Sequence, residues 1–426
     1  MGIEETIFHS YISHGGIFKK DRDVLRPSYL PDSLPHRNEQ ISQIASILVT
    51  ALKGGRPSNI LIFGKTGTGK TAVVKFIGKE IEKIYKPSVF KVGEQSIKDK
   101  AAEKKQEQMY QKDNYNQVWS KVNWIYVHCE VVDTQYGVLA HIGNHFIDEW
   151  DKRIPFTGWP TEKVYNALKE TIDNSERNRG ITIVVLDEID KLVYKSGDDV
   201  LFHLTSINEE LKNSKLAIIA ITNDTNFTLF LDTRVRSRLG EERLVFPPYN
   251  ALQLQDILKQ RAELAFEPNV LADGVIPMCA GIAAQEHGDA RRALDLLRVA
   301  GELAERDKAV RVEEHYVTKA KNKIELDCQM EVIKTLPAQS KILLLGVICE
   351  TKLGNTVLTT GEVYDYYREL CKNANLSVLT QRRIADLISE LDMLGLINAR
   401  IIYKGRGGRT REIKLSVPID ETIAVL

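Results

Sequence analysis

The segment from Gly64 to Thr71 (GKTGTGKT) matches the phosphate-binding pattern G-x-x-x-x-G-K-[ST] at every constrained position. The apolar run Ile60 to Phe63 precedes it, and Ala72 to Tyr85 follows with the spacing of an amphipathic helix. This context predicts a buried strand, a glycine-rich turn and a helix whose positive N-terminus faces bound phosphates. The lysine of the pattern reaches the outer phosphates, and the final hydroxyl helps to hold Mg²⁺. The sequence therefore predicts an ATP or ADP site made of Gly64, Lys65, Thr66, Gly67, Thr68, Gly69, Lys70 and Thr71.

Composition limits the remaining possibilities. The chain has 426 residues, of which 43% are apolar, and this favours two or three domains with substantial cores. Its 58 basic residues balance 58 acidic ones, so nucleic-acid binding would require local clusters of positive charge. The five cysteines show no C-x-x-C spacing, and no apolar stretch is long enough to span a membrane. We expect a soluble cytoplasmic protein with no membrane partner and with neither a disulfide framework nor a zinc site.

Two further strands predict polar groups beside the phosphates. The run Ile183 to Leu186 leads into Asp187 and Glu188, and in P-loop ATPases the first acid supports Mg²⁺ while the second polarises the attacking water. Asn223 follows the apolar run that ends at Thr222, and strand ends line the ligand crevice of parallel sheets. Taken alone, the acids fit a helix cap and Asn223 fits a turn. Together with the loop, they predict Thr71 and Asp187 as Mg²⁺ ligands, Glu188 as the base, and Asn223 beside the γ-phosphate.

The order of patterns predicts a parallel α/β domain, a helical domain and a winged helix. Strands are expected at residues 59–63, 124–129, 182–187, 217–222 and 243–246, with a charged, partly helical insertion at 91–121. After the proline pair at 247–248, helices are expected at 252–266, 275–286, 290–305 and 312–332. Beyond about residue 336 the pattern is three helices and a two-stranded hairpin. The expected domains are an ATPase base at 1–249, a lid at 250–332 and a winged helix at 333–426.

Two arginine clusters complete a resemblance to a known family. They lie at residues 232–238 (DTRVRSR) and 288–293 (GDARRA), and the motifs together follow the order seen in AAA+ ATPases. From about residue 15 to 420 the chain resembles archaeal replication initiators of the origin recognition and cell division cycle family. The resemblance implies sensor roles for Asn223 and Arg291, and an arginine finger, Arg238 or Arg234, offered to a neighbouring subunit. It further implies that the nucleotide contacts Tyr29, Asn38, Tyr249 and Arg291.

Two segments are candidates for DNA binding. The stretch 400–414 carries six basic residues around glycines 405, 407 and 408, and residues 381–383 open a helix whose first turn can face a groove. Basic wings also serve protein contacts, and the loop at 153–160 alone resembles an ordinary proline-bounded loop. The family resemblance implies DNA contact from both. The candidate residues are Gln381, Arg382, Arg383, Lys404, Arg406, Arg409 and Arg411, with Arg153, Phe156, Thr157, Gly158 and Trp159.

The sequence thus predicts an ATPase that acts as a replication initiator. The resemblance implies that it binds duplex origin DNA, helps to recruit the replicative helicase, acts beside other initiator subunits and associates with the nucleoid. ATP binding and slow hydrolysis would switch it. The alternatives are a clamp-loader or branch-migration motor, which also pairs this ATPase with helical or winged modules, and a nucleotide-gated transcription regulator.

Overall fold

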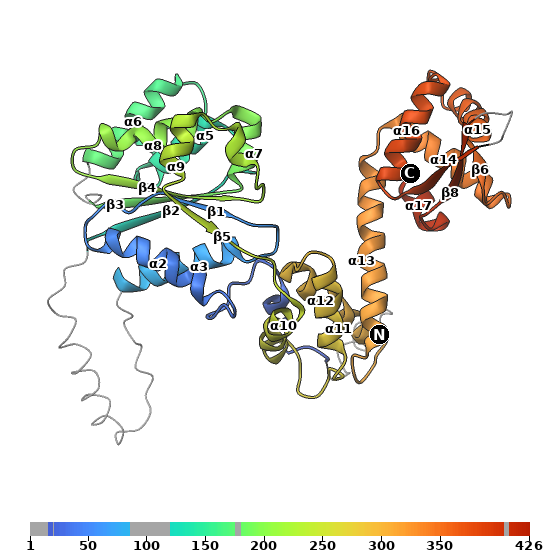
Figure 1. Cartoon of the computed structure of the whole chain (residues 1–426), viewed down its shortest axis with the longest axis horizontal. Helices are drawn as coiled ribbons and strands as arrows, with labels where there is room; N and C mark the ends of the chain where they lie inside the picture. Colours follow the sequence, from blue (N-terminus) through green and yellow to red (C-terminus); the bar gives the residue numbers. More distant parts are fainter. Residues whose placement is uncertain (1–15, 20, 86–119, 175–179, 404–408) are drawn as a thin grey trace, which may run out of the picture. The chain divides into compact units, whose positions relative to one another are not determined.

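A five-stranded parallel sheet forms the centre of the N-terminal part of the chain (Figure 1). The computed structural model describes residues 16–19, 21–85, 120–174, 180–403 and 409–426. The strand order is β2-β3-β4-β1-β5, and every neighbouring pair is parallel. The predicted parallel α/β domain is confirmed, and each predicted strand end lies within two residues of the observed one. The strands are β1 (Ile60–Phe63), β2 (Val122–His128), β3 (Ile181–Asp187), β4 (Lys215–Thr222) and β5 (Glu242–Val245).

Helices cover both faces of this sheet (Figure 1). Alternate residues of each strand point to opposite faces, so Leu61 joins one apolar cluster while Ile60 and Ile62 join the other. A slip of one residue would exchange the two sets, and burial on both faces therefore determines the register. One face carries α2 (Asn38–Leu52) and α3 (Lys70–Tyr85). The other carries α5 (Gln135–Asn144), α6 (Thr161–Asn174), α7 (Ile189–Ser196), α8 (Asp199–Ser206) and α9 (Thr233–Leu239).

The strand register brings the polar strand ends together. His128 of β2 lies opposite Asp187 of β3, and Phe63 of β1 lies opposite Thr222 of β4. Because all of these strands run in the same direction, the residues that follow them meet at the carboxyl edge of the sheet. Gly64, Glu188 and Asn223, each next in the chain after a strand, are therefore placed at that edge.

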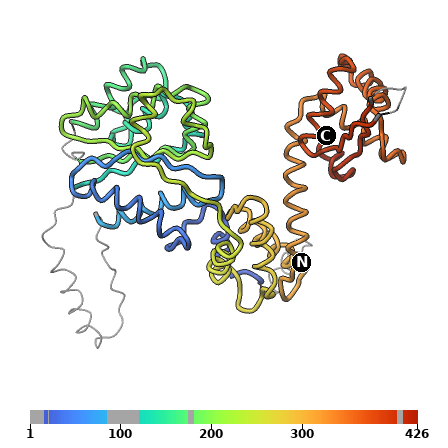
Figure 2. The backbone as a smooth tube through the Cα atoms, viewed as in Figure 1, coloured from blue at the N-terminus to red at the C-terminus, as the bar shows by residue number. Residues whose placement is uncertain are grey.

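A helical lid follows the sheet directly, as expected. Figure 2 follows the backbone from β5 into α10 (Ala251–Ala265), which is followed by α11 (Val275–Gln285) and α12 (Ala290–Arg306). Asn250 begins α10 with a capping box: its side chain accepts from the Gln253 N–H, and the Gln253 side chain accepts from the Asn250 N–H. By contacts between Cα atoms, the sheet and these helices form one compact unit, residues 1–301 with 308–313.

The second compact unit contains residues 302–307 and 314–426. Residues 302–307 include the end of α12, and the unit continues with the long helix α13 (Glu314–Thr335). The expected boundary between residues 332 and 333 therefore falls inside a helix. The predicted three helices and hairpin are present, but the sequence did not reveal the short strand β6 or the final helix α17. The elements are α14 (Ala338–Lys352), β6 (Leu358–Thr359), α15 (Thr360–Asn373), α16 (Gln381–Met393), β7 (Ile397–Tyr403), β8 (Arg409–Leu415) and α17 (Ile419–Val425).

The small sheet of this unit has the order β6-β8-β7 and is antiparallel, which is the arrangement of a winged helix. Most of the predicted charged insertion lies in the segment 86–119, outside the described residues, as does the predicted wing tip at 404–408. Within the described parts of the chain, no helix is both long and apolar enough to cross a membrane.

Candidate active site

A cavity opens at the carboxyl edge of the parallel sheet. Its empty space, including open solvent at its mouth, is about 1100 Å³. Segments that lie far apart in sequence line it, from the N-terminal stretch at Arg26 to the lid residue Leu294. The predicted site residues on its wall are Tyr29, Thr66, Gly67, Thr68, Gly69, Lys70, Thr71, Asp187, Glu188, Asn223, Tyr249 and Arg291.

The Lys70 ammonium group is held at the centre of the loop. Its Nζ donates to the carbonyl oxygens of Gly64 and Lys65, both at 2.7 Å, and to Oδ1 of Asn223 at 2.8 Å. Burial lowers the pKa of Lys70 to about 8, although the nearby Asp187 opposes that shift. Asn223, which is predicted to lie near the γ-phosphate, is thus hydrogen-bonded to Lys70, the lysine predicted to bind the outer phosphates.

The glycines of the loop are required by close approaches as well as by backbone angles. Gly69 has φ +85°, and a Cβ there would lie 2.8 Å from the Tyr249 hydroxyl. Gly67 has φ +68°, and a Cβ there would lie 1.6 Å from Oδ1 of Asp289. Both angles belong to the left-handed region that favours glycine. Substitution at Gly67 would therefore strain the loop and push away the lid residue that contacts it.

Arg37 does not line the cavity but supports the phosphate loop, a role that no sequence pattern indicated. Only 2% of it is exposed, its Nε donates to the Thr68 carbonyl at 3.0 Å, and its Nη2 donates to the Pro247 carbonyl at 2.7 Å. The guanidinium lies 3.8 Å from the centroid of the Tyr249 ring. Arg37 thus ties the phosphate loop to the segment that leads into the lid. Asn38, the predicted nucleotide contact beside it, is exposed and does not line the cavity.

Thr71 and Asp187, the predicted Mg²⁺ ligands, are in contact. The Thr71 hydroxyl donates to Oδ2 of Asp187 at 2.8 Å, and the phenol of Tyr126 donates to the same oxygen. Hydroxyl and carboxylate oxygens suit Mg²⁺, which prefers oxygen ligands and keeps several waters, so these residues fit that ion. Tyr126 lies on β2 and was not predicted, because no local pattern connects a tyrosine on one strand with an aspartate on the next.

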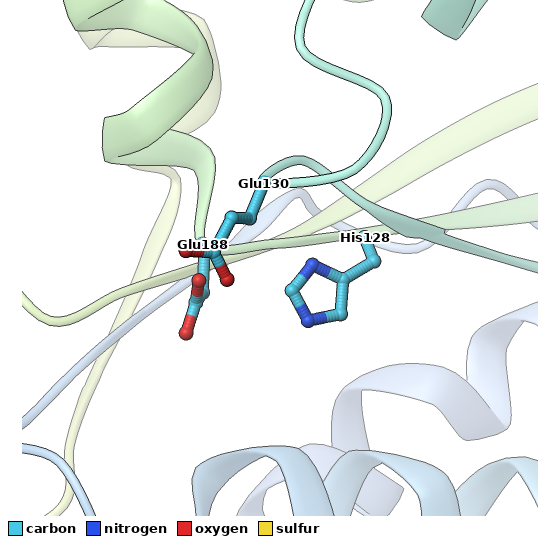
Figure 3. Close-up of side chains that lie close together, drawn as sticks. All are labelled: His128, Glu130 and Glu188. Carbon is cyan, nitrogen blue, oxygen red and sulfur yellow. The ribbon is translucent and has the colours of Figure 1, made fainter. Parts of the chain in front are cut away.

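Glu188, the predicted base, has an unusual backbone and an acidic neighbour. Its φ of 56° and ψ of 45° are left-handed, which is uncommon for a residue with a side chain. Burial raises the pKa of Glu188, and the Glu130 carboxylate raises it further, while His128 opposes the shift. Figure 3 shows the side chains of His128, Glu130 and Glu188 gathered at this edge of the sheet.

The lid contacts the phosphate loop through the start of α12. The Ala290 N–H donates to the Gly67 carbonyl at 3.2 Å, and Arg291 lines the cavity. Asp289 caps this helix, because its Oδ1 accepts from the Arg291 N–H at 2.7 Å. Arg261 and Tyr29 also line the cavity, and the guanidinium of Arg261 lies 4.6 Å from the centroid of the Tyr29 ring. The structure therefore brings Arg291 and Tyr29 to the same cavity as the P-loop.

Neither candidate for the arginine finger lines this cavity. Arg238 donates to Ser206 Oγ and to Glu209, both at 2.7 Å, so partners in its own chain already hold it. The side chain of Arg234 is 71% exposed and forms an ion pair with Asp232 at 3.2 Å. Arg234 is thus the more available of the two.

The predicted DNA-binding loop at 153–160 presents an exposed edge. Phe156 is 66% exposed, and Thr157 and Gly158 are exposed beside it. Arg153 lies 5.3 Å from the centroid of the Trp150 ring, and Lys163 lies 3.9 Å from that of Trp159. The loop therefore combines aromatic rings with cations that stack on them, a combination suited to nucleic-acid surfaces.

In the winged helix, α16 presents its first turn to solvent. Gln381, Arg382 and Arg383 are exposed there, and Arg383 lies near two carboxylates, those of Asp386 at 3.8 Å and Glu390 at 3.9 Å. Arg411 differs from the other candidates, because its Nη1 donates to the Ala385 carbonyl and to Ser389 Oγ. Its guanidinium therefore braces the sheet against α16. Lys404, Arg406 and the side chain of Arg409 lie outside the described residues.

Family models match three successive parts of the chain. They are "ATPase family associated with various cellular activities (AAA)" at residues 60–246, "Cdc6 AAA+ ATPase-type lid domain" at 255–322 and "CDC6, C terminal winged helix domain" at 331–425. A parallel sheet with a P-loop, paired carboxylates after a neighbouring strand, a helical lid and a winged helix define an AAA+ ATPase. The protein is an ATPase of this class.

Two named relatives show which family of AAA+ ATPases the chain belongs to. The chain is 53% identical over 413 residues to the ORC1-type DNA replication protein of Pyrococcus abyssi. The matched region covers 97% of this chain and 90% of that protein. It is 50% identical over 424 residues to ORC1-type DNA replication protein 1 of Methanosarcina mazei, covering 99% of this chain and 93% of that protein. The chain belongs to the archaeal ORC1/Cdc6 family of DNA replication initiators, as the motifs predicted.

A solved structure supports the fold along almost the whole chain. The Aeropyrum pernix ORC1 protein in complex with DNA is 40% identical to this chain, with a TM-score of 0.71. The similarity covers 96% of this chain and 97% of that one. The predicted combination of ATPase base, lid and winged helix is therefore confirmed at the level of fold.

Proposed function

We propose that this protein is an ATP-switched initiator that binds duplex origin DNA and helps to recruit the replicative helicase. One observation carries the proposal: a single cavity joins the phosphate loop, the Asp187–Glu188 pair, Asn223 and the lid residue Arg291. These residues come from the sheet and from the lid, in a chain that also has a winged helix. Nucleotide in the cavity would contact all of these groups together.

The loop is arranged to exchange its internal contacts for phosphate contacts. Lys70 donates to two backbone carbonyls and to Asn223, and the β- and γ-phosphates would replace those acceptors. Gly67 and Gly69 leave room for backbone N–H groups to turn toward the anion. When bound with the nucleotide, Mg²⁺ would neutralise phosphate charge, and Thr71 and Asp187 are the residues that would hold it.

Hydrolysis would depend on Glu188 and Asn223. Glu188 would accept a proton from the attacking water, and its carboxylate lies on the wall of the same cavity as the phosphate loop. Asn223 would release Lys70 to the phosphates and orient the water. Arg291 would place positive charge beside the phosphates from the lid side of the cavity.

The position of the lid would respond to the bound nucleotide through contacts at the start of α12. Its Ala290 N–H already contacts the phosphate loop, and the Asp289 carboxylate lies against Gly67. Phosphates brought to this loop would repel Asp289 and attract Arg291. The balance between these two neighbouring side chains would make the lid position depend on which nucleotide is bound.

DNA binding would use the winged helix and the loop at 153–160. The first turn of α16 is exposed and basic, and the relative from Aeropyrum pernix was solved in complex with DNA. In the first turn of α16, Arg383 lies near two carboxylates, and Arg382 is the exposed arginine beside it. Other initiator subunits would receive Arg234 or Arg238 as a finger. Recruitment of the helicase and association with the nucleoid are part of the proposal, and membership of the initiator family supports them.

The test combines nucleotide state with DNA occupancy. We expect Lys70→Ala to lose tight ATP binding, whereas Lys79→Ala, an exposed lysine of α3, should bind like the parent. Genomic footprints of the parent should concentrate at replication origins and should differ between ATP and ADP. Occupancy spread over many promoters would favour a transcription regulator instead. Ring assembly with strongly DNA-stimulated turnover would favour a motor.

A further inference from the structure

Three potential metal ligands meet beside the predicted base. His128 ends β2, Glu130 lies in the turn that follows, and Glu188 follows β3. One ligand atom from each lies within 4.8 Å of the other two, and Figure 3 shows the imidazole ring facing both carboxylates. The pairing of β2 with β3, which sets His128 opposite Asp187, holds this arrangement in place.

The cluster lacks the partners that its charges require. Within the described ranges, no lysine or arginine forms an ion pair with Glu130 or Glu188. The Nδ1 atom of His128 is shielded from solvent and has no hydrogen-bond partner. A buried imidazole nitrogen without a partner carries a free-energy cost, and a cation bound between it and the two carboxylates would relieve that cost.

We propose that His128, Glu130 and Glu188 form a site for a transition-metal dication of the Zn²⁺ type, and that the bound metal inhibits ATP hydrolysis. Imidazole nitrogen with two carboxylates suits Zn²⁺, which takes three protein ligands and leaves a position for water. Mg²⁺ prefers oxygen ligands alone, so the imidazole selects against the ion that accompanies ATP. The metal would occupy the Glu188 carboxylate and prevent it from accepting a proton.

The geometry needs only a small adjustment. Bonds of about 2.0–2.1 Å to Zn²⁺ place tetrahedral ligand atoms about 3.3 Å apart, somewhat closer than the 4.8 Å limit of this cluster. Glu130 is exposed, so its side chain is free to close that gap, while His128 and Glu188 are half-buried and fixed by their strands. The binding of metal does not depend on the proposed function, whereas the inhibition depends on Glu188 acting as the base.

Metal binding is tested first, without nucleotide. The exposed thiols of Cys328 and Cys349 also attract Zn²⁺, so the parent for this test is the full chain with both replaced by serine. Calorimetric titration with Zn²⁺ in millimolar Mg²⁺ should find one strong site. Co²⁺ should give a spectrum of nitrogen and oxygen ligands without a thiolate band. His128→Asn and Glu130→Gln should each weaken binding at least about tenfold, since losing a direct ligand costs no less than losing a supporting contact.

The controls replace residues of the same kinds elsewhere on the surface. His141→Asn tests the nearby histidine pair with His145, and Glu162→Gln tests an exposed carboxylate of α6. Both should bind Zn²⁺ like the parent. Because Glu130 is exposed, its replacement by glutamine does not threaten folding. Equal Zn²⁺ affinity in Glu130→Gln and the parent, or loss of the site in His141→Asn, would overturn the proposal.

Inhibition is tested at buffered free Zn²⁺, so that chelation by ATP does not change the metal concentration. Hydrolysis of Mg·ATP by the parent should fall as Zn²⁺ fills the site, while the affinity for a fluorescent ATP analogue stays constant. Relative to its own metal-free rate, Glu130→Gln should need at least about ten times more Zn²⁺. Zn²⁺ bound at this site without any fall in hydrolysis would overturn the inhibitory role. Normal hydrolysis by Glu188→Gln would instead refute the proposed function, and the calorimetric result would still stand.

Discussion

Replacing Arg37 with methionine should destabilise the ATPase unit and disorganise its phosphate loop. Methionine fills much of the same space but cannot donate to the carbonyls of Thr68 and Pro247, which Arg37 now holds at 3.0 and 2.7 Å. Both acceptors would be left without that donor in a region where Arg37 itself is only 2% exposed. The perturbation therefore removes a connection between the loop and the lid without adding charge or bulk.

The expected loss follows from these contacts. A hydrogen bond from a charged donor contributes about 1.5–3 kcal/mol, and stacking of the guanidinium on Tyr249 contributes about 0.5–2 kcal/mol. The methionine side chain recovers part of the packing, so we expect a net loss of about 3–5 kcal/mol in the free energy of unfolding. Lysine can donate to one carbonyl but cannot span both, so Arg37→Lys should lose roughly half as much.

Urea unfolding followed by circular dichroism measures the loss, and titration with a fluorescent ATP analogue measures the state of the loop. ATP affinity of Arg37→Met should fall at least about tenfold, since the Thr68 carbonyl belongs to the loop itself. Arg311→Met, at an exposed arginine, serves as control and should change stability by less than about 0.5 kcal/mol. An unfolding free energy of Arg37→Met within about 1 kcal/mol of the parent would refute the role of Arg37 in holding the phosphate loop to the segment before the lid.

Four further predictions concern ATP hydrolysis, DNA binding and the stability of the winged helix. Glu188→Gln should keep ATP affinity but slow hydrolysis at least about a hundredfold, as measured by phosphate release; unchanged turnover would exclude it as the base. Tyr126→Phe should raise the Mg²⁺ concentration needed for half-maximal hydrolysis, because Asp187 loses a donor that orients it, while metal-free ATP binding stays constant. Arg382→Ala should weaken DNA binding and lower the salt slope by about one unit. Arg411→Ala should instead lower the stability of the winged helix by about 1–3 kcal/mol and leave the slope unchanged, because its guanidinium already binds α16.

The different environments of Arg382 and Arg411 could not be predicted from the sequence. Both are basic residues in a segment with a DNA-binding pattern, and charge alone made them equivalent candidates. In the folded chain, Arg382 lies exposed at the first turn of α16, whereas Arg411 reaches across from β8 to Ala385 and Ser389. The difference depends on how the sheet packs against the helix, and no local pattern encodes it.

At the start of α2, the sequence likewise did not show which of two neighbouring side chains, Arg37 or Asn38, is buried. The family resemblance implies a nucleotide contact at Asn38, whereas the side chain that is buried in the folded chain is that of Arg37. Which side chain at the start of α2 turns inward depends on where the helix begins relative to the sheet. Tyr126 and His128 were missed for a related reason. Asp187 ends β3 and Glu188 follows it, so only the register of β2 with β3 brings these residues near Tyr126 and His128.

Short-range patterns, by contrast, were sufficient to predict the phosphate loop, the two carboxylates, the order of the domains and the family. The geometry of Gly64 to Thr71 depends on glycine backbones and on the strand and the helix next to the loop in the chain. Consecutive residues are therefore enough to predict it. The Arg37 clamp, the contact of Asp289 with Gly67 and the cluster at His128 depend on residues brought together across long stretches of chain. Such contacts exist only after burial on both faces of the sheet has selected a single register, which is why they became visible in the folded protein.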